Sequence, residues 1–480
     1  MRVTIAAAAL VFGLARACAD PATPEGARKI EATYAAYFSQ DLIDDKIVTV
    51  TPRGDDYVIA WDFEKALAAM GAPAHAAAIA PFVYRLTPTL GGGWLVRASS
   101  LPKLTVPPSG ESGREGGTAA FQGFRFEGLY DPGAMAPFRA KLSLGSLKID
   151  ARARSGGLLK HFVVSQEGVA SDMQVKAGER AGEVDIVSTQ SFAGADQQTS
   201  VLDDDGEPHD ATDSKQGAAS GDGQVTGLRV EAIGDLWRFL VSEIGKGPIA
   251  PEALKPKLEA LAPLWREAEG RGEGEDIAIT FPGGAVSMKS ASQEGKLTGL
   301  VEHASAALAL TVNDVKLDLA DAPDWLTKIW PATLALKVEA SVDGLDRATQ
   351  MALDDPDLLK SGKLDEGTKS AIRETLLAGR PRVRISQTRL STPLLDATFE
   401  GDAEFGVQTR AHAHVTSDDL DKLLQALADV APSEPRAQQF LYVATFARGL
   451  ARVEDGRLVW DIDFVGPGGV RVNGHLFSQP

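Results

Sequence analysis

Apolar and polar residues alternate along much of the chain, and one such stretch contains a single interruption. Within residues 306–319 the apolar side chains recur at every second position, slip by one at Asn313-Asp314, and then alternate again. A period of two with one slip is typical of a half-buried strand that carries a bulge or a tight turn. Residues 138–151 show the same pattern, with the slip at Gly145-Ser146. We interpret the two stretches as copies of one duplicated β unit. A similar short strand precedes each copy, over residues 126–131 and 297–302.

The other alternating segments predict further short strands, several of them paired as hairpins. The expected strands are residues 47–50, 57–61, 82–86, 94–97, 159–164, 173–176, 184–187, 458–462 and 470–472. Strands that pass directly into helices are expected over residues 228–240, 334–353 and 411–427. Further helices are expected over residues 20–42, 63–80, 251–268 and 434–450, and a loop over the Pro- and Gly-rich residues 107–117. This order predicts an α+β fold, mostly antiparallel sheet with helices packed on one face, built from two related halves.

Two of the expected helices have capping signals. Thr416 or Ser417 is the expected cap of the helix that carries Leu420, Leu423, Leu424 and Leu427 at helical spacing. Ser433 is the expected cap of the helix over residues 434–450, in which Pro435 costs no hydrogen bond. The apolar side of that second helix is expected to consist of Phe440, Val443, Ala444 and Ala447.

Residues 196–223 differ in composition from their surroundings. They are rich in Asp, Ser and Gly and hold few apolar residues, which predicts a solvated linker or a long hairpin loop. The alternative is a calcium loop, because Asp203, Asp205 and Gly206 match the third, fifth and sixth places of an EF-hand. Val201 and Thr212 then occupy places that need a carboxylate, so the linker is the preferred interpretation. It separates an N-terminal half, residues 20–195, from a C-terminal half, residues 224–480.

Residues 1–19 have the features of a secretory signal peptide. A positive start is followed by a short apolar run and by the small-x-small site Ala17-Cys18-Ala19. We therefore expect cleavage before Asp20 and a periplasmic or secreted protein; the alternative is a retained N-terminal anchor. Cys18 is the only cysteine, so the mature chain is expected to have no disulfide. Ala15 stands where lipid attachment to Cys18 would require Leu.

The chain carries a net charge of −17. Nucleic-acid binding needs clustered Lys and Arg for phosphate contacts, so nucleic acid is not an expected partner. No basic amphipathic stretch in the sequence indicates adsorption to anionic lipid, and no later stretch is apolar enough to predict a transmembrane segment after signal cleavage. We attribute the acidity to solubility.

Candidate chemistry is sparse. The motifs of zinc proteases, serine hydrolases, phosphate-binding loops and CxxC proteins are not present. Residues 466–469 are expected to form a hairpin turn, with a phosphate cradle as the alternative. His412 and His414 lie two apart on an expected strand and would share one face, where Asp418 or Asp419 could complete a metal site. The other interpretation, which we prefer, is that Ala411, Ala413 and Val415 face the core while both histidines face water. Asp461 and Asp463 would also share a face, expected to be solvated.

Several segments of the last hundred or so residues share one set of turn and strand signals: residues 376–385, 390–394, 399–403 and 455–458, and the terminal Val472-Asn473-Gly474. Together they resemble the YdgA-like family of exported bacterial proteins of unknown function. In that family a helix leads into a strand and hairpin of this kind, and the chain ends on a strand and Asn-Gly. The chain is also similar, more loosely, to AsmA-like periplasmic β proteins, whose amphipathic strands line an apolar groove. The resemblance implies an envelope protein that binds or organises, without an established active site to carry over.

We therefore expect a non-enzymatic exported protein without a cofactor, whose partner is a lipid or another envelope protein. The alternatives are a metal-dependent hydrolase that uses His412 and His414, and a structural or protein-interaction module. Around Leu308 the strand is not strongly polar on either side, since Ala307, Ala309 and Thr311 line its second face. We expect helices to cover both sides as ordinary core. The alternative is an open apolar strip on which a lipid chain or hydrophobic segment binds.

Overall fold

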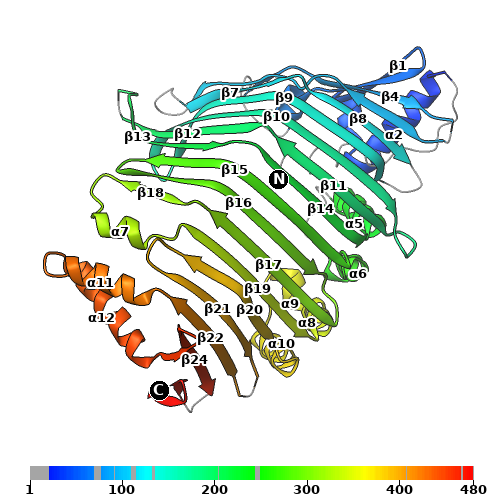
Figure 1. Cartoon of the computed structure of the whole chain (residues 1–480). Coiled ribbons are helices and arrows are strands. Elements are labelled where there is room, and N and C mark those ends of the chain that lie inside the picture. Colours follow the sequence, from blue (N-terminus) through cyan, green and yellow to red (C-terminus); the bar gives the residue numbers. More distant parts are fainter. Residues whose placement is uncertain are drawn as a thin grey trace. The chain divides into compact units, whose positions relative to one another are not determined.

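The computed structural model describes residues 21–69, 77–90, 92–109, 115–131, 136–203, 205–243, 249–406, 408–465 and 469–478. The expected signal peptide with Cys18 lies outside the described residues, as do residues 466–468 of the expected glycine-rich turn. The chain divides into two compact units, Met1–Arg266 and Glu267–Pro480, here called unit 1 and unit 2. The predicted α+β fold dominated by antiparallel sheet is confirmed in both (Figure 1).

Unit 1 contains helices at its two ends and a series of strands between them. In chain order its elements are α2 (Pro24–Phe38), α3 (Asp41–Asp44), β1 (Val48–Arg53), β2 (Asp56–Trp61), α4 (Phe63–Ala69), β3 (Ala78–Ile79), β4 (Phe82–Pro88), β5 (Trp94–Ala98), β6 (Leu104–Ser109), β7 (Glu115–Gln122), β8 (Arg125–Asp131), β9 (Ala136–Ser155), β10 (Leu158–Ala177), β11 (Val184–Phe192), β12 (Gly194–Leu202), β13 (Pro208–Gln216), β14 (Ala219–Leu228), α5 (Val230–Glu243) and α6 (Pro251–Leu261).

The long strands β9 and β10 pair with each other and organise the sheet of unit 1. Each changes neighbour halfway along: β9 pairs first with β8 and then with β7, while β10 pairs first with β12 and then with β11. The changes coincide with Gly123, between β7 and β8, and with Gly168 in β10, both of which have positive φ. The slip expected at Gly145-Ser146 thus lies within β9. It stands next to the break between β7 and β8 at Gly123 on one side and next to Gly168 of β10 on the other.

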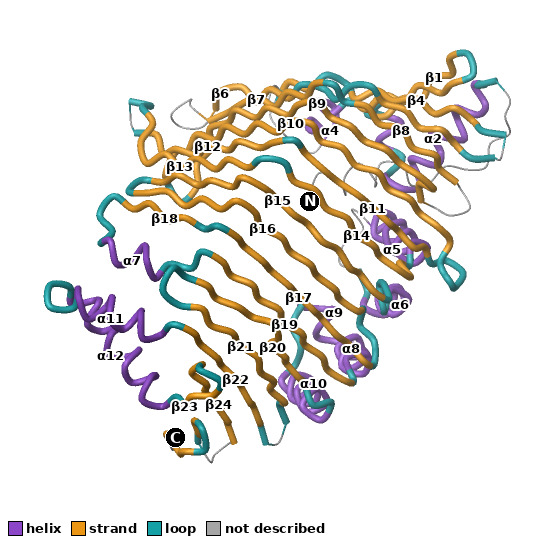
Figure 2. Tube along the Cα trace, viewed as in Figure 1, coloured by secondary structure: helices purple, strands orange, loops and turns teal. Residues whose placement is uncertain are grey.

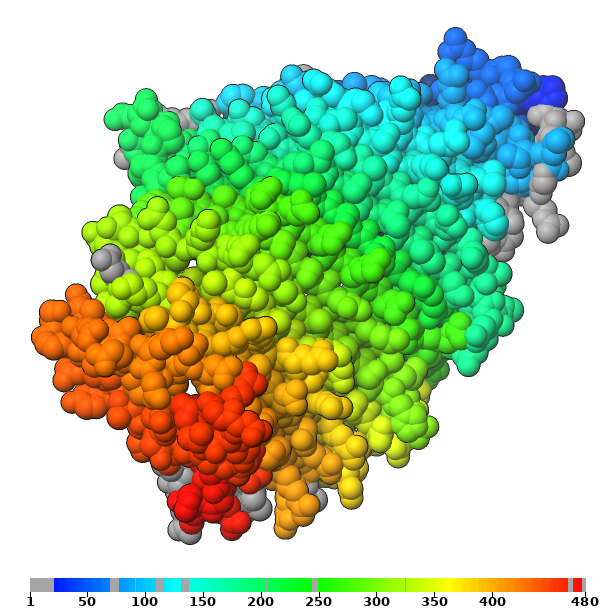
Figure 3. All heavy atoms as spheres, viewed as in Figure 1, coloured from blue at the N-terminus to red at the C-terminus, as the bar shows by residue number. Residues whose placement is uncertain are grey.

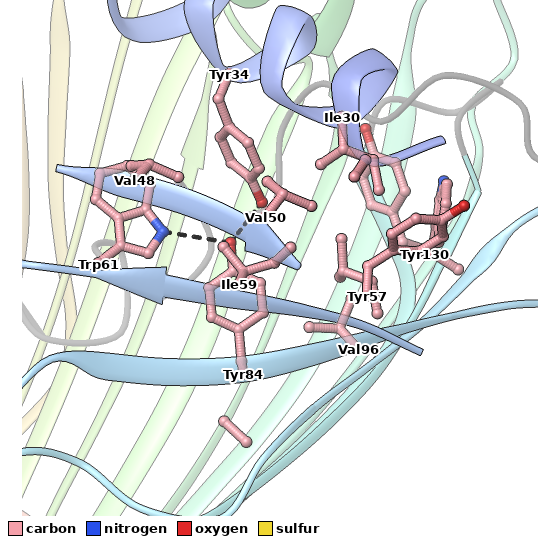
Figure 4. Packing of buried hydrophobic residues seen from close by; sticks show 14 of the residues in the cluster. Ile30, Tyr34, Val48, Val50, Tyr57, Ile59, Trp61, Tyr84, Val96 and Tyr130 are labelled. Atoms are coloured by element: carbon pink, nitrogen blue, oxygen red, sulfur yellow. Dashed lines mark hydrogen bonds between the residues drawn. The ribbon is translucent and has the colours of Figure 1, made fainter. Parts of the chain in front are cut away.

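The principal core of unit 1 lies where α2 packs against β1, β2, β4 and β5. Ile30 and Tyr34 of the helix are almost fully buried against the inward side chains of these strands (Figure 4). The Tyr34 and Tyr84 hydroxyls form a hydrogen bond of 2.5 Å, and Trp61 Nε1 donates to the Tyr84 hydroxyl at 3.4 Å. Thr23 caps α2 by accepting from the Gly26 N–H, as the favoured N-cap residues do.

The segment expected to be a linker is part of this sheet. Most of residues 196–223 fall in β12, β13 and β14, which pair with β10, with β12 and with β11 respectively. The linker prediction is therefore wrong for these residues. Their polar side chains lie on strands whose residues are mostly half-buried or exposed on both faces, so the alternation that marks a one-sided strand is missing. The units also divide at Arg266, beyond the expected boundary at 223, because the Arg266 N–H bonds to the Thr226 carbonyl at 2.9 Å.

Unit 2 contains one antiparallel sheet with helices at the ends of its strands (Figure 2). Its elements are β15 (Glu267–Phe281), β16 (Gly284–Thr298), β17 (His303–Asn313), β18 (Lys316–Leu319), α7 (Asp324–Ile329), β19 (Thr333–Asp343), α8 (Leu345–Asp354), α9 (Pro356–Ser361), α10 (Glu366–Ala378), β20 (Arg382–Ser391), β21 (Asp396–Glu404), β22 (Arg410–Asp418), α11 (Leu420–Val430), α12 (Pro435–Leu450), β23 (Arg452–Glu454), β24 (Arg457–Val465), β25 (Val470–Val472) and β26 (His475–Ser478).

The sheet of unit 2 follows the order of the chain. β17 and β18 both pair with β16, and Asp314, with φ 53°, interrupts the ladder between them. The predicted slip is therefore a local irregularity at Asp314 that leaves the register against β16 unchanged, since Ser290 pairs with Asn313 and Ser287 with Lys316. Successive antiparallel pairings then connect β17, β19, β20, β21, β22 and β24. Helices α8, α9 and α10 connect β19 to β20 at one end of the strands. Helices α7, α11 and α12 lie at the other end, because α7 precedes β19 and α11 follows β22.

Several expected element boundaries differ from the structure. Residues 107–117 include parts of β6 and β7, residues 230–232 begin α5, and residues 267–268 begin β15. Asp419 and Glu434 occupy the N-cap positions of α11 and α12 without a capping side-chain bond, in place of the expected Thr416 or Ser417 and Ser433. Asn473-Gly474, with φ of 50° and 81°, is a hairpin turn between β25 and β26. The resemblance implied that the chain ends on a strand and Asn-Gly, whereas here the strand β26 follows the Asn-Gly pair.

Candidate functional site

The strands of unit 2 sort their side chains onto two chemically different faces. The cross-strand register places Leu308 beside Val338, and Val338 beside Ile385. The residues that alternate with these point to the opposite face, where Lys337 and Glu339 form an ion pair of 3.4 Å. We call the two sides of the sheet from β17 to β24 the apolar face and the charged face.

The charged face is crossed by ion pairs between and along neighbouring strands. Arg457 Nε donates to Asp418 Oδ1 at 2.8 Å, with a second bond of 2.6 Å from the other nitrogen to Oδ2. Arg389 makes a similar pair with Asp396. These carboxylates and guanidinium groups therefore satisfy each other on a surface that water can reach, as expected of the solvated face of a sheet. The bond from Arg457 holds the pKa of Asp418 below its usual value.

His412 and His414 form a ladder of two pairs with carboxylates on the adjacent strand. The Nδ1–H of His412 donates to Asp463 at 2.9 Å, and that of His414 donates to Asp461 at 2.6 Å. Both pairs are directly opposite in the register of β22 and β24. Arg452 also binds Asp461, and the pKa of Asp461 is lowered, first by the hydrogen bond from His414 and also by the charge of Arg452.

The structure does not bring together the metal site considered from the sequence, in which Asp418 or Asp419 would complete a site with His412 and His414. Asp418 is bonded to Arg457 and Asp419 pairs with Lys422 at 2.8 Å, so neither expected donor joins the histidines. Within the part of the chain that the structure describes, no three His, Cys, Asp or Glu side chains are grouped to hold a metal ion. Each imidazole instead finds a carboxylate of its own, and both histidines lie on the charged face, with Ala413 and Val415 pointing to the apolar face.

The acidic loop that resembled a calcium site is a hairpin turn between β12 and β13. The Asp203 carboxylate accepts the backbone N–H groups of Asp205 and Glu207, each at 2.9 Å. These bonds, that of Glu207 first, lower the pKa of Asp203. The loop is closed by strands on both sides, whereas an EF-hand loop joins two helices. Asp203 thus stabilises the turn in the manner of an Asx residue.

The apolar face is a continuous array of side chains from six strands. Rows of directly paired residues cross it, and one row contains Leu308, Val338, Ile385, Gly401, Ala413 and Ile462. Leu308 is 50% exposed, and Ile385, Phe399 and Phe464 are each more than a third exposed. Every residue of β19 is half-buried or exposed. The expected helical cover over both sides of the sheet at Leu308 is therefore wrong.

Helices α11 and α12 pack against one end of the apolar face. There Leu458 and Trp460 are buried together with Leu420 of α11, and side chains of α12 join the same cluster. Trp460 Nε1 also donates to the Ala447 carbonyl of α12 at 2.7 Å. In the space-filling view α11 and α12 gather at one side of unit 2, and the strands continue as adjoining coloured bands beyond them (Figure 3). Among the described residues, the buried contacts of helices with this face thus lie at the α11 and α12 end of the strands.

The two pairs of the histidine ladder could have been anticipated from the sequence only in part. Each pair of like residues is spaced by two on an expected strand, which correctly predicts a shared face. That β22 pairs with β24 across two intervening helices is a long-range pairing, and the local pattern does not contain it.

Comparison of the chain with family models, with curated proteins and with solved structures finds no match to any of them. Among the described residues, none of the helices has both the length and the apolar character needed to cross a bilayer.

Proposed function

We propose that the protein is an exported, non-enzymatic envelope protein whose apolar face holds an extended lipid chain. The observation that supports this most is the exposure of large apolar side chains on that face, with Leu308 half exposed on β17, the first of its six strands. Contiguous exposed apolar surface is uncommon on soluble proteins and marks interaction sites. The charged face, by contrast, carries several ion pairs and offers water a favourable contact.

The dimensions of the apolar face suit a long, thin ligand. Six neighbouring strands span about 24 Å across the sheet, given the spacing of paired strands. The row that crosses these strands consists of Leu, Val and Ile interrupted by Gly401 and Ala413, whose small size leaves the surface lower along this row. An acyl chain laid across the strands would remove these groups from water without needing a polar partner in the sheet. The proposed compartment rests on the signal-peptide pattern of residues 1–19.

The test is lipid binding by paired variants on the two faces of one strand. Solvent extraction and mass spectrometry of the purified full chain should find co-purifying lipid, and a fluorescent fatty acid should bind to the delipidated protein. Leu308→Glu places a charge on the apolar face and should weaken that binding by at least about tenfold, since a buried carboxylate is strongly disfavoured. Ala309→Glu is the matched control, because its side chain lies on the charged face of the same strand.

Equal binding by the two variants would remove the apolar face from the proposal. If the wild-type chain yields no lipid and binds no fluorescent fatty acid, the proposed function is wrong altogether. The compartment is checked separately by sequencing the mature N-terminus, which should be Asp20 or a residue close to it; an intact Met1, or a lipid on Cys18, contradicts the predicted cleavage.

A further inference from the structure

The helix α12 exposes several of its large apolar residues. The side facing the protein carries Ala437, which is fully buried, and the partly buried Leu441, Ala444 and Leu450. The outward side carries further large residues, with Tyr442 at 67% exposure, Val443 at 69%, and Phe440 and Phe446 at just over half. In an ordinary surface helix the large apolar residues face the core. We call this outward row of Phe440, Tyr442, Val443 and Phe446 the aromatic ridge.

The charge of α12 is also unlike that of the rest of the chain. The chain has 66 acidic residues among 480, yet α12 contains none and carries Arg436 and Arg448. Arg448 faces inward and binds Asp421 of α11 at 3.0 Å. Arg436 is exposed and, on a helix of 3.6 residues per turn, projects from the same side as the aromatic ridge. The outward surface of α12 is therefore apolar, aromatic and positively charged.

We propose that the aromatic ridge docks on the surface of a membrane that contains anionic lipid. Phe and Val would enter the boundary of the acyl region, Tyr442 would keep its hydroxyl at the headgroups, and Arg436 would contact lipid phosphate. A bilayer interface supplies an apolar layer and negative charge side by side, which is the combination that this helix surface complements. The inference stands on α12 alone, and it holds whether or not the apolar face of the sheet binds lipid.

The sequence conceals this surface because Phe440 and Val443 recur at a spacing that predicts a buried face. In the structure the small residue Ala437 is the α12 residue fully buried against Trp325 and Leu427. Phe440 contacts Trp325 at the margin of this cluster, with ring centroids 5.9 Å apart, and stays about half exposed. The neighbouring Tyr442, Val443 and Phe446 remain outside.

The experiment is co-sedimentation of the purified full chain with vesicles of phosphatidylglycerol and with vesicles of phosphatidylcholine. Wild type should bind phosphatidylglycerol, and Val443→Glu should weaken that binding by at least about tenfold through lost apolar contact and added repulsion. Val453→Glu is the matched control, because Val453 is 62% exposed in the nearby β23; it should bind as wild type does. Arg436→Gln should reduce the preference for phosphatidylglycerol over phosphatidylcholine.

A tryptophan placed at the ridge reports the contact directly. Phe446→Trp should show a blue shift of its fluorescence when phosphatidylglycerol vesicles are added, measured against wild type because the chain has other tryptophans. Absence of vesicle binding by wild type, or equal binding by Val443→Glu and Val453→Glu, would overturn the proposal. It would also be overturned if gel filtration showed that Val443→Glu dissociates a wild-type oligomer, since the ridge would then contact a second copy of the chain.

Discussion

The Asp461 carboxylate receives hydrogen bonds from His414 and Arg452, and its backbone N–H donates to Asn473 Oδ1 at 2.8 Å. Asn473 in turn donates to the carbonyls of Leu450 and Val459, which connects the end of α12 to β24. These few residues tie the C-terminal strands to the helix before them. Their sequence spacing predicted a shared face for the histidines and for the aspartates, but not which residue bonds to which, since that depends on pairing between distant strands.

The lowered pKa of Asp461 has a consequence for stability against pH. Its carboxylate is favoured in the folded state, so its contribution is present above the ordinary Asp pKa of about 3.9 and is lost as pH falls through the lower folded pKa. Asp461→Asn should therefore lower the free energy of unfolding by about 1 kcal/mol at neutral pH, and the deficit should shrink below about pH 4. Urea unfolding at several pH values measures it. Asp463→Asn is the control, since Asp463 is more exposed, and an equal or larger loss there would contradict the argument.

Tyr34 and Tyr84 set an alkaline limit for unit 1. Burial raises the pKa of both hydroxyls, that of Tyr84 to about 12. The folded state thus favours the protonated phenols, and this contribution is present below the ordinary Tyr pKa of about 10 and lost as pH rises through the folded value. We expect Tyr34→Phe to cost about 1 kcal/mol at neutral pH and to make the alkaline loss of stability shallower. Phenolate absorbance followed with urea unfolding tests this, and an unchanged alkaline slope would contradict it.

At the scale of elements, the alternation of apolar residues predicted the strands best where one face differs from the other. β19 was expected close to its observed limits and β22 close to its observed start, and the slip at Asn313-Asp314 correctly indicated a backbone irregularity there. Residues 196–223 were misassigned because strands with polar residues on both faces have no apolar period to detect. α12 was placed correctly, but its buried side was not, because spacing identifies a row of residues without saying what packs on it.

Two glycines of unit 1 with positive φ, Gly168 within β10 and Gly156 in the turn between β9 and β10, permit a direct comparison of backbone strain with crowding. Gly168 and Gly156 have φ of 62° and 63°, but a Cβ at Gly168 would lie 2.8 Å from the Ala193 Cβ, whereas none of the described atoms lies within 4 Å of one at Gly156. Both alanine variants should lose about 1–2 kcal/mol from the left-handed backbone. Gly168→Ala should lose roughly a further 1–3 kcal/mol from overpacking. Equal urea midpoints for the two variants would show that the strands around Gly168 shift without cost.

At the scale of the whole molecule, the division at Arg266 makes a prediction about fragments. β14 pairs with β11, and Trp237 of α5 donates its Nε1–H to the Tyr37 carbonyl of α2 at 2.8 Å, so residues 224–266 complete unit 1. A fragment of residues 267–480 should unfold cooperatively in urea. A fragment of residues 224–480 should bind more of a hydrophobic dye, because α5 and α6 are then separated from their partners. The opposite ranking would place the boundary near the linker expected from the sequence.

The order of the strands in unit 2 also governs how its fold is reached. From β15 to β22 most pairings join strands that are close in the chain, although β17 pairs with β19 past β18, which pairs with β16, and β19 pairs with β20 across α8, α9 and α10. Folding rates fall as contacting residues become more distant in sequence, and this arrangement keeps most of them close. The sheet can grow largely in the direction of synthesis, with each completed strand serving as the template for a later one. We expect the slower steps to be the two pairings that wait for helices to form between their strands, β19 with β20 and β22 with β24.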